Sequence, residues 1–188
     1  MRMAKALRAM KRCTVITFTS IGICLSSAIV TLAANEQETR GSRAIPLADG
    51  EIRVTTTDDG DEIEIVDKDG DLLSLSVCAG PGKRYDALVG FFRAFQRAVA
   101  LGQRDQVLEM LHVPLRVGRG EEGILRSRDR ILADYDEVFD ESFLQQLKAI
   151  DPRRVFCNWQ GVMIGEGMVW AEVYDGELKI ITINRPDG

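Results

Sequence analysis

Residues 154–184 read RVFCNWQGVMIGEGMVWAEVYDGELKIITIN, and this stretch decides the fold. Its apolar, β-branched and aromatic residues form three runs, and two short turns separate the runs. The first turn is expected at Gly165-Glu166-Gly167 and the second at Asp175-Gly176. The pattern predicts a three-stranded antiparallel meander, in which Gly161 marks a bulge that bends the first strand. A curved sheet of this kind encloses a cavity against helices more easily than a flat one.

The residues before the meander carry helical periodicity. Apolar side chains recur at intervals of three and four over Tyr85–Leu101, which predicts an amphipathic helix. A second helix is expected from Asp105 to Leu111, and Pro114 closes it. His112, the only histidine of the chain, is then a helix-end residue rather than a catalytic base. A short strand is expected at residues 115–117.

Two helix caps can be read farther along the chain. Ser127 precedes a helical pattern that runs to Phe139, and Asp140 precedes another, which Asp151-Pro152 ends. Arg130 and Asp134 lie four residues apart on the first of these helices. This spacing lets the two side chains pair on the surface.

An acidic segment at residues 51–80 precedes the helices. Asp58-Asp59-Gly60 and Lys68-Asp69-Gly70 separate its strand-like runs, and Asp followed by Gly is typical of hairpin turns. Leucine and valine alternate with serine over residues 73–77, which predicts a strand with one wet face. The acids of the second turn form only a fragment of a calcium-binding loop, because the closing Glu is absent. We therefore predict solvated turn acids, and no metal or cofactor.

The order of elements after residue 83 resembles that of the nuclear-transport-factor-2-like superfamily, a cone-shaped α+β fold with small exported bacterial members. The resemblance is carried by FFRAFQRAVALGQRDQV (91–107), VPLRV (113–117), ILRSRDRILADYDEVF (124–139), QGVMIGEGMVW (160–170) and LKIITIN (178–184). It implies helices packed on a curved antiparallel sheet over residues 83–188, with the hairpins of residues 51–80 as an extension before them. It also implies a homodimer, since members of the superfamily often pair through the sheet.

Catalytic residues are not carried over from the resemblance. The ketosteroid-isomerase-like enzymes of the superfamily place an acidic general base near the strand after the second helix, where this chain has no acid at residues 112–116. If the sheet curves, Trp159 or Trp170 can line a pocket with Arg116 as an anion partner. Together with Tyr135 these residues form the candidate ligand site. The alternative is that both tryptophans are core residues.

The first 34 residues predict export from the cytoplasm. Residues 1–12 hold five basic residues, residues 13–34 are uncharged, and Ala33-Ala34 offers a cleavage point. This is the pattern of a cleaved signal peptide. The alternative is an uncleaved membrane anchor, because the uncharged run is long enough for a span. Residues 35–50 then form a linker, and the domain is expected in the periplasm or outside the cell.

Removal of the signal changes the charge and the cysteine content. The signal holds five of the 24 basic residues and none of the 29 acidic ones, so 19 bases face 29 acids, a net charge of −10. Such a balance argues against nucleic acid or anionic lipid as a partner. Cys78 and Cys157 remain, and they either form a disulfide or stay separate as buried thiols.

These features favour an exported cell-envelope binding or interaction module without catalysis, whose partner is a small molecule or a protein. One alternative is an enzyme of the isomerase or dehydratase type that uses the cone pocket. Another is a periplasmic immunity or inhibitor protein, whose acidic hairpins plug a basic cleft. The membrane is a partner only if the N-terminal segment stays uncleaved.

Overall fold

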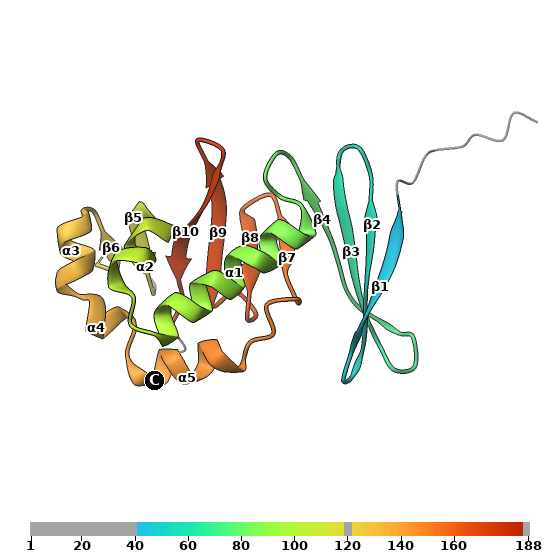
Figure 1. The fold of residues 1–188 in the computed structure, drawn as a ribbon, viewed down its shortest axis with the longest axis horizontal. Helices are drawn as coiled ribbons and strands as arrows, with labels where there is room; N and C mark the ends of the chain where they lie inside the picture. The colour runs from blue at the N-terminus through green and yellow to red at the C-terminus, as the bar shows by residue number, and fades with distance from the viewer. Residues whose placement is uncertain (1–40, 119–121, 186–188) are drawn as a thin grey trace, which may run out of the picture. The chain divides into compact units, whose positions relative to one another are not determined.

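The computed structural model describes residues 41–118 and 122–185, and the predicted signal peptide at 1–34 lies outside the described residues. Within these two ranges, ten strands form two sheets, and five helices accompany them (Figure 1). The fold is therefore α+β, as the sequence predicts. No helix in the described ranges is long and apolar enough to span a bilayer.

The first sheet, here called the hairpin sheet, is an antiparallel meander of four consecutive strands. These are β1 (Ser42–Leu47), β2 (Gly50–Thr56), β3 (Gly60–Asp67) and β4 (Leu72–Ala79). Strands β2 to β4 confirm the predicted hairpins, whereas β1 arises from residues placed in the linker. It forms because each of its residues has a partner on β2, and because Ile45 and Leu47 pack against the core.

One acid of the turn between β3 and β4, Asp67, stabilises that turn. Asp67 Oδ1 accepts hydrogen bonds from the backbone N–H groups of Asp69 and Asp71, both at 2.9 Å. Gly70 follows with a φ of +86°, a conformation that glycine adopts without strain. The carboxylate of Asp67 thus stabilises the local backbone.

The second sheet has six strands in the order β6-β5-β10-β9-β8-β7. Their bounds are β5 (Leu111–Val117), β6 (Ile124–Leu125), β7 (Phe156–Asn158), β8 (Gly161–Ile164), β9 (Val169–Tyr174) and β10 (Glu177–Ile183). β10 runs parallel to β5, and all other neighbours are antiparallel. The sheet is curved and mixed rather than antiparallel throughout.

The first run of the predicted meander is two strands, not one. Asn158 of β7 pairs with Gly161 of β8, and residues 159 and 160 form the turn between them. Asn158 Oδ1 accepts the N–H of Gln160 at 2.8 Å, and Gly161 has a φ of +137°. The predicted bulge at Gly161 is therefore wrong, because the glycine serves a hairpin turn. The two predicted turns farther on are confirmed.

Strand β5 begins four residues earlier than the sequence predicts. Pro114 lies inside it, after a cis peptide bond from Val113, and His112 is a strand residue stacked 3.8 Å from the ring of Tyr174. The prediction that Pro114 closes a helix and that His112 sits at its end is wrong. Proline is tolerated here because the β5–β10 ladder is interrupted between Leu111 and Arg116.

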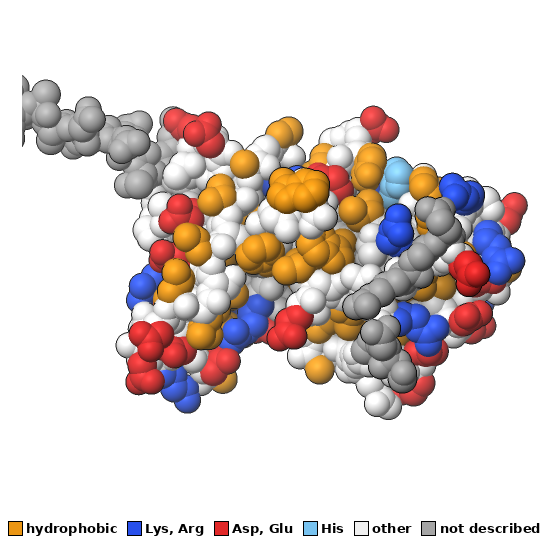
Figure 2. Space-filling view, turned by 180° about the vertical axis from the view of Figure 1, so that it is seen from behind, with side chains coloured by type: hydrophobic (Ala, Val, Ile, Leu, Met, Phe, Trp, Pro, Cys, Tyr) orange, Lys and Arg blue, Asp and Glu red, His pale blue; other side chains and the backbone are white. Residues whose placement is uncertain are grey.

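The helices follow the predicted pattern with one break. They are α1 (Tyr85–Ala100), α2 (Arg104–Met110), α3 (Arg128–Ala133), α4 (Tyr135–Val138) and α5 (Glu141–Ala149). Ser127 caps α3 and Asp140 caps α5 through their side chains, as predicted, whereas the helix expected to run to Phe139 breaks at Asp134. Helix α1 lies across one face of the six-stranded sheet (Figure 1), and Figure 2 shows the molecule from behind.

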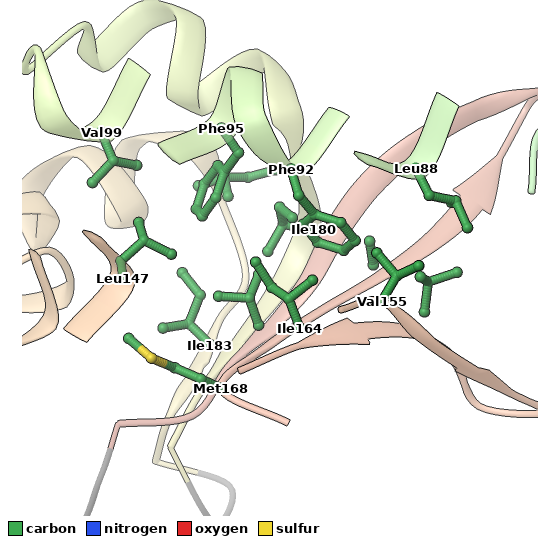
Figure 3. Close-up of a cluster of buried hydrophobic side chains, with 14 of the residues drawn as sticks. Leu88, Phe92, Phe95, Val99, Leu147, Val155, Ile164, Met168, Ile180 and Ile183 are labelled. Carbon is green, nitrogen blue, oxygen red and sulfur yellow. The ribbon is translucent and has the colours of Figure 1, made fainter. Parts of the chain in front are cut away.

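The core lies between α1 and the six-stranded sheet, and Figure 3 shows side chains from both pointing toward one another. The buried residues include Leu88, Phe92, Phe95 and Val99 from α1, and Ile164, Ile180 and Ile183 from the strands. Phe92 is fully buried, so its replacement by Ala is expected to cost about 3–5 kcal/mol. This packing leaves the opposite face of the sheet without a covering helix.

A disulfide joins the two sheets. Cys78 of β4 is bonded to Cys157 of β7, and the two Cα atoms lie 5.1 Å apart. β4 and β7 are each the edge strand of their own sheet, and no ladder connects them. Of the two alternatives that the sequence leaves open for Cys78 and Cys157, the structure thus has the disulfide, which fixes β4 beside the six-stranded sheet.

Candidate binding surface

Strand β4 turns its large apolar side chains to solvent. Leu73, Leu75 and Val77 are 58%, 49% and 52% exposed, and we call these three residues the β4 stripe. The serines between them face the other way, and Ser76 is buried. The alternation seen in the sequence is therefore present, but the serine face is the inner one.

The disulfide explains this orientation of β4. Side chains alternate along a strand, so Ser74 and Ser76 must share the face of Cys78, which is buried in its bond to β7. Ser76 Oγ has no hydrogen-bond partner within the described residues, an arrangement that costs roughly 1–3 kcal/mol. The disulfide thus holds the apolar face of β4 toward solvent, whereas hydrophobic burial alone would turn that face inward.

Two glutamates border the β4 stripe. On β3, Glu62 pairs across the ladder with Val77, and Glu64 pairs with Leu75, so acidic and apolar side chains lie side by side on one face. The stripe is an apolar strip with negative charge along one side. Such a surface is complementary to a partner that is apolar and positively charged.

A second apolar row crosses the uncovered face of the six-stranded sheet. Phe156 pairs with Met163, and Met163 pairs with Trp170, so these three residues of β7, β8 and β9 are neighbours. Their chain neighbours Val162 and Ala171 are fully buried in the core. Because side chains alternate, the three half-buried residues lie on the opposite face. We call them the open-face row.

An apolar groove of about 670 Å³ lies where the β4 stripe meets the open-face row. Leu73 of the stripe and Phe156 and Met163 of the row all line it, together with Ile150 and Met168. Figure 2 shows hydrophobic side chains gathered in the middle of this face. The groove gives an apolar ligand group a place to enter beside the exposed strand.

Two acids line the apolar groove, Asp151 and Glu166. Three hydrogen bonds from the Arg153 guanidinium, the shortest at 2.6 Å, lower the pKa of Asp151 against the opposing effect of burial. A carboxylate with a lowered pKa is a weaker general base. Glu166, the other acid, is exposed in the β8–β9 turn at a φ of +55°.

A second, more polar groove of about 750 Å³ adjoins the first. The two grooves share Gln146, Met163, Gly165, Glu166 and Met168. The indole of Trp170 lines the polar groove. Four side-chain amides line it as well: Gln146, Asn158, Gln160 and Asn184. Amides and indole together offer both polar contacts and an apolar surface.

The structure separates the four residues of the predicted ligand site. Trp170 lines the polar groove, whereas Trp159 is 89% exposed in the β7–β8 turn and Arg116 is exposed on β5. Tyr135 is buried on α4, where its ring lies 4.8 Å from the Arg104 guanidinium. Of the four, Trp170 alone lines either of the two grooves described above.

Apart from Trp170, sequence reasoning missed the residues that shape the two grooves. The pattern of β4 does not tell which face is inner unless Cys78 is taken as the fixed point. With Cys78 buried in a disulfide, residues 73, 75 and 77 must face outward. Asn158 and Gln160 lie inside an otherwise strand-like run. Two polar side chains so close together are the signal from which the turn between β7 and β8 could have been predicted.

Comparisons with known proteins identify no relative of this chain. No protein-family model matches the chain, and no match is found among curated proteins or among solved structures. The function is therefore argued from the two grooves and the β4 stripe.

Proposed function

We propose that this chain is an exported, non-catalytic binding module of the cell envelope, built on the cone fold of the nuclear-transport-factor-2-like superfamily. The observation that carries the proposal is the β4 stripe, where three large apolar side chains are exposed while the serines between them face inward. A strand that served packing alone would bury the apolar side chains. Contiguous exposed apolar surface of this kind is typical of interaction sites.

The partner that we propose is an extended protein segment with both apolar and basic side chains. Covering the exposed halves of Leu73, Leu75 and Val77 contributes roughly 1 kcal/mol for each residue. The apolar groove beside Leu73 receives one further apolar side chain of the partner. Glu62 and Glu64 offer carboxylates to Lys or Arg of the partner, which sets the orientation of the segment.

A second copy of the chain is a poor occupant of this face. Two-fold pairing through the β4 stripe brings Glu62 and Glu64 of one copy near the same acids of the other, and like charges oppose association. The net charge of −10 expected after signal removal adds to the repulsion. The homodimer implied by the resemblance therefore needs another face of the molecule.

Export to the periplasm or the cell exterior is the second part of the proposal. Residues 1–34 have the composition of a signal peptide, and the Cys78–Cys157 disulfide is typical of an oxidising compartment. N-terminal sequencing of the protein purified from the cell envelope tests this part. Cleavage near residue 34 supports export in a released form, whereas an intact N-terminus in the membrane fraction favours the anchor.

The binding test uses two designed peptides and the purified exported protein. One peptide alternates Leu with Lys and the other alternates Leu with Glu, and fluorescence anisotropy measures their affinities. We expect the Leu-Lys peptide to bind more tightly, with an affinity that falls as salt rises. Leu75→Ser/Val77→Ser should abolish binding. Leu101→Ser is the matched control, because it removes a 65% exposed leucine at the end of α1.

A charge reversal distinguishes this surface from general hydrophobic adhesion. Glu62→Lys/Glu64→Lys should exchange the preference between the two peptides. Unchanged affinity in Leu75→Ser/Val77→Ser would refute the proposed surface. A substrate turnover that is lost in Glu166→Gln would instead favour the isomerase- or dehydratase-type alternative, since Glu166 lines both grooves.

A further inference from the structure

We propose that the polar groove binds an uncharged oligosaccharide. This site differs from the β4 stripe, and the proposal goes beyond the protein partner proposed above. It rests on the hydrogen-bonding capacity, the charge and the aromatic surface of the groove. Its volume of about 750 Å³ falls within the range of roughly 300–1,000 Å³ that is usual for ligand sites.

The amides of the polar groove keep hydrogen-bonding groups for a ligand. Asn158 uses Oδ1 to accept the N–H of Gln160 at 2.8 Å, so its Nδ2 remains as a donor. Asn184 donates through Nδ2 to the Gly167 carbonyl at 2.6 Å, so its Oδ1 remains as an acceptor. The Gln160 side chain has no partner in the described part of the chain. Donors and acceptors placed together match hydroxyl groups, each of which both donates and accepts.

Backbone groups contribute little to recognition on this face. Met163 and Trp170 are paired across the β8–β9 ladder, and both strands also pair with their other neighbours. The N–H and C=O groups of the groove floor are therefore engaged within the sheet. An extended peptide binds best at a free strand edge, which this floor does not offer. Recognition falls to side chains, and amide side chains favour a ligand rich in hydroxyls.

The lining charges favour a neutral ligand. Glu166 and Arg185 are the charged residues among the described lining residues. Arg185 is already hydrogen-bonded to Asp140, the cap of α5. A strongly anionic or cationic ligand therefore finds little opposite charge in the groove.

The indole of Trp170 supplies the apolar surface that a sugar ring needs in the groove. Trp170 is half-buried in the groove, and its ring lies close to Gly167, since a Cβ at Gly167 would lie 3.3 Å from the indole Nε1. Trp170 Nε1 has no acceptor within the described residues, so it is an additional donor. Trp159, 89% exposed, stands in the chain between Asn158 and Gln160, which both line the groove. The apolar face of a pyranose ring can stack on the indole of Trp170.

The test titrates the exported protein with uncharged trisaccharides: cellotriose, maltotriose, laminaritriose and the β-1,4-linked trimer of N-acetylglucosamine. The chain has two tryptophans, so Trp159→Phe leaves Trp170 as the sole indole reporter inside the groove. We expect a saturable change in its emission with at least one trisaccharide, and a matching heat in isothermal titration calorimetry. Gln160→Ala, a change in an exposed turn, should weaken binding about fivefold.

The control variant and the competing outcomes keep the two proposals apart. Leu75→Ser/Val77→Ser should leave trisaccharide binding unchanged while it abolishes binding of the Leu-Lys peptide. Absence of saturable binding for every trisaccharide would overturn the inference, and so would binding that Gln160→Ala and Asn158→Ala both leave unchanged. Saturable binding of an uncharged peptide in place of the sugars would also overturn it.

Discussion

Asp61 of β3 accepts a hydrogen bond from the backbone N–H of Tyr85, the first residue of α1, at 2.7 Å. Arg84 donates to the other oxygen of the same carboxylate at 3.1 Å. Arg84 occupies the N-cap position of α1 but makes no side-chain cap of its own. The hairpin sheet thus supplies the acceptor that α1 lacks locally, and a negative charge at this end of the helix is favourable.

Asp61→Asn should destabilise the protein at neutral pH. Burial alone would raise the pKa of Asp61, but the Tyr85 N–H and the Arg84 guanidinium lower the pKa below its ordinary value of 3.8. A carboxyl with a depressed pKa stabilises the fold above its unfolded pKa, and this contribution is lost as pH falls through the folded pKa. We expect a loss of about 1–2 kcal/mol near neutral pH, measured by urea unfolding.

The same measurement at acidic pH supplies the internal check. The difference between wild type and Asp61→Asn should shrink as pH falls below about 4, because the carboxyl of the unfolded chain is protonated first and the native carboxyl, whose pKa is lower, follows. Asp59→Asn, in the exposed turn before β3, is the control and should change stability little. A loss in Asp61→Asn that stays constant down to the lowest pH would contradict the role of the charge.

Loss of the Cys78–Cys157 disulfide should lower stability strongly. The bond closes a loop between residues 79 positions apart, which corresponds to about 4.5 kcal/mol in the chain-entropy description. Cys78→Ser/Cys157→Ser should therefore show a much lower urea midpoint than wild type. Reductant should destabilise wild type and leave the double variant unchanged. Equal midpoints for the two proteins would show that packing alone holds the sheets together.

Ser76→Ala should stabilise the protein or leave its stability unchanged, although it removes a polar side chain from a strand. The Ser76 hydroxyl is buried without a partner in the described chain, so its removal relieves a desolvation penalty of roughly 1 kcal/mol. Thermal unfolding measures the gain. Ser74→Ala, at the half-buried position on the same face, is the control and should gain less. A clear loss of stability in Ser76→Ala would indicate a partner for the hydroxyl.

Gln96→Ala should loosen the contact between α1 and α5. Gln96 Nε2 donates to the carbonyls of Leu147 and Ile150, at 2.8 Å and 2.9 Å, where α5 ends. Its removal leaves both carbonyls without this donor, so we expect a loss of about 1–3 kcal/mol in urea unfolding. Arg93→Ala, an exposed change on the same helix, should cost much less.

Elements that depend on local sequence could be predicted. The periodicity of α1, the caps at Ser127 and Asp140, and the Asp-Gly turns all rest on residues within a few positions of one another. The pairing of Arg130 with Asp134, at 2.6 Å, follows from the same short range. Spacing in the sequence is sufficient evidence for such features.

Features that depend on distant partners could not be predicted. Strand β5 continues through Pro114 because its ladder with β10 is interrupted there. The residues around Pro114 do not indicate that this segment pairs with β10. The outward face of β4 is set by Cys157, far along the chain. Gln96 lies on what the periodicity marks as the wet side of α1, and only α5 explains its burial. Each of these results from tertiary context that outweighs local pattern.

Strand β10 is the last of the described elements, yet it lies in the interior of the six-stranded sheet, between β5 and β9. Neither neighbour can complete its ladder before residues 177–183 arrive, and the parallel pairing with β5 joins segments far apart in the chain. A chain that is exported N-terminus first, as proposed, would therefore stay unfolded while it crosses the membrane. Its sheet would close only after these residues had crossed the membrane.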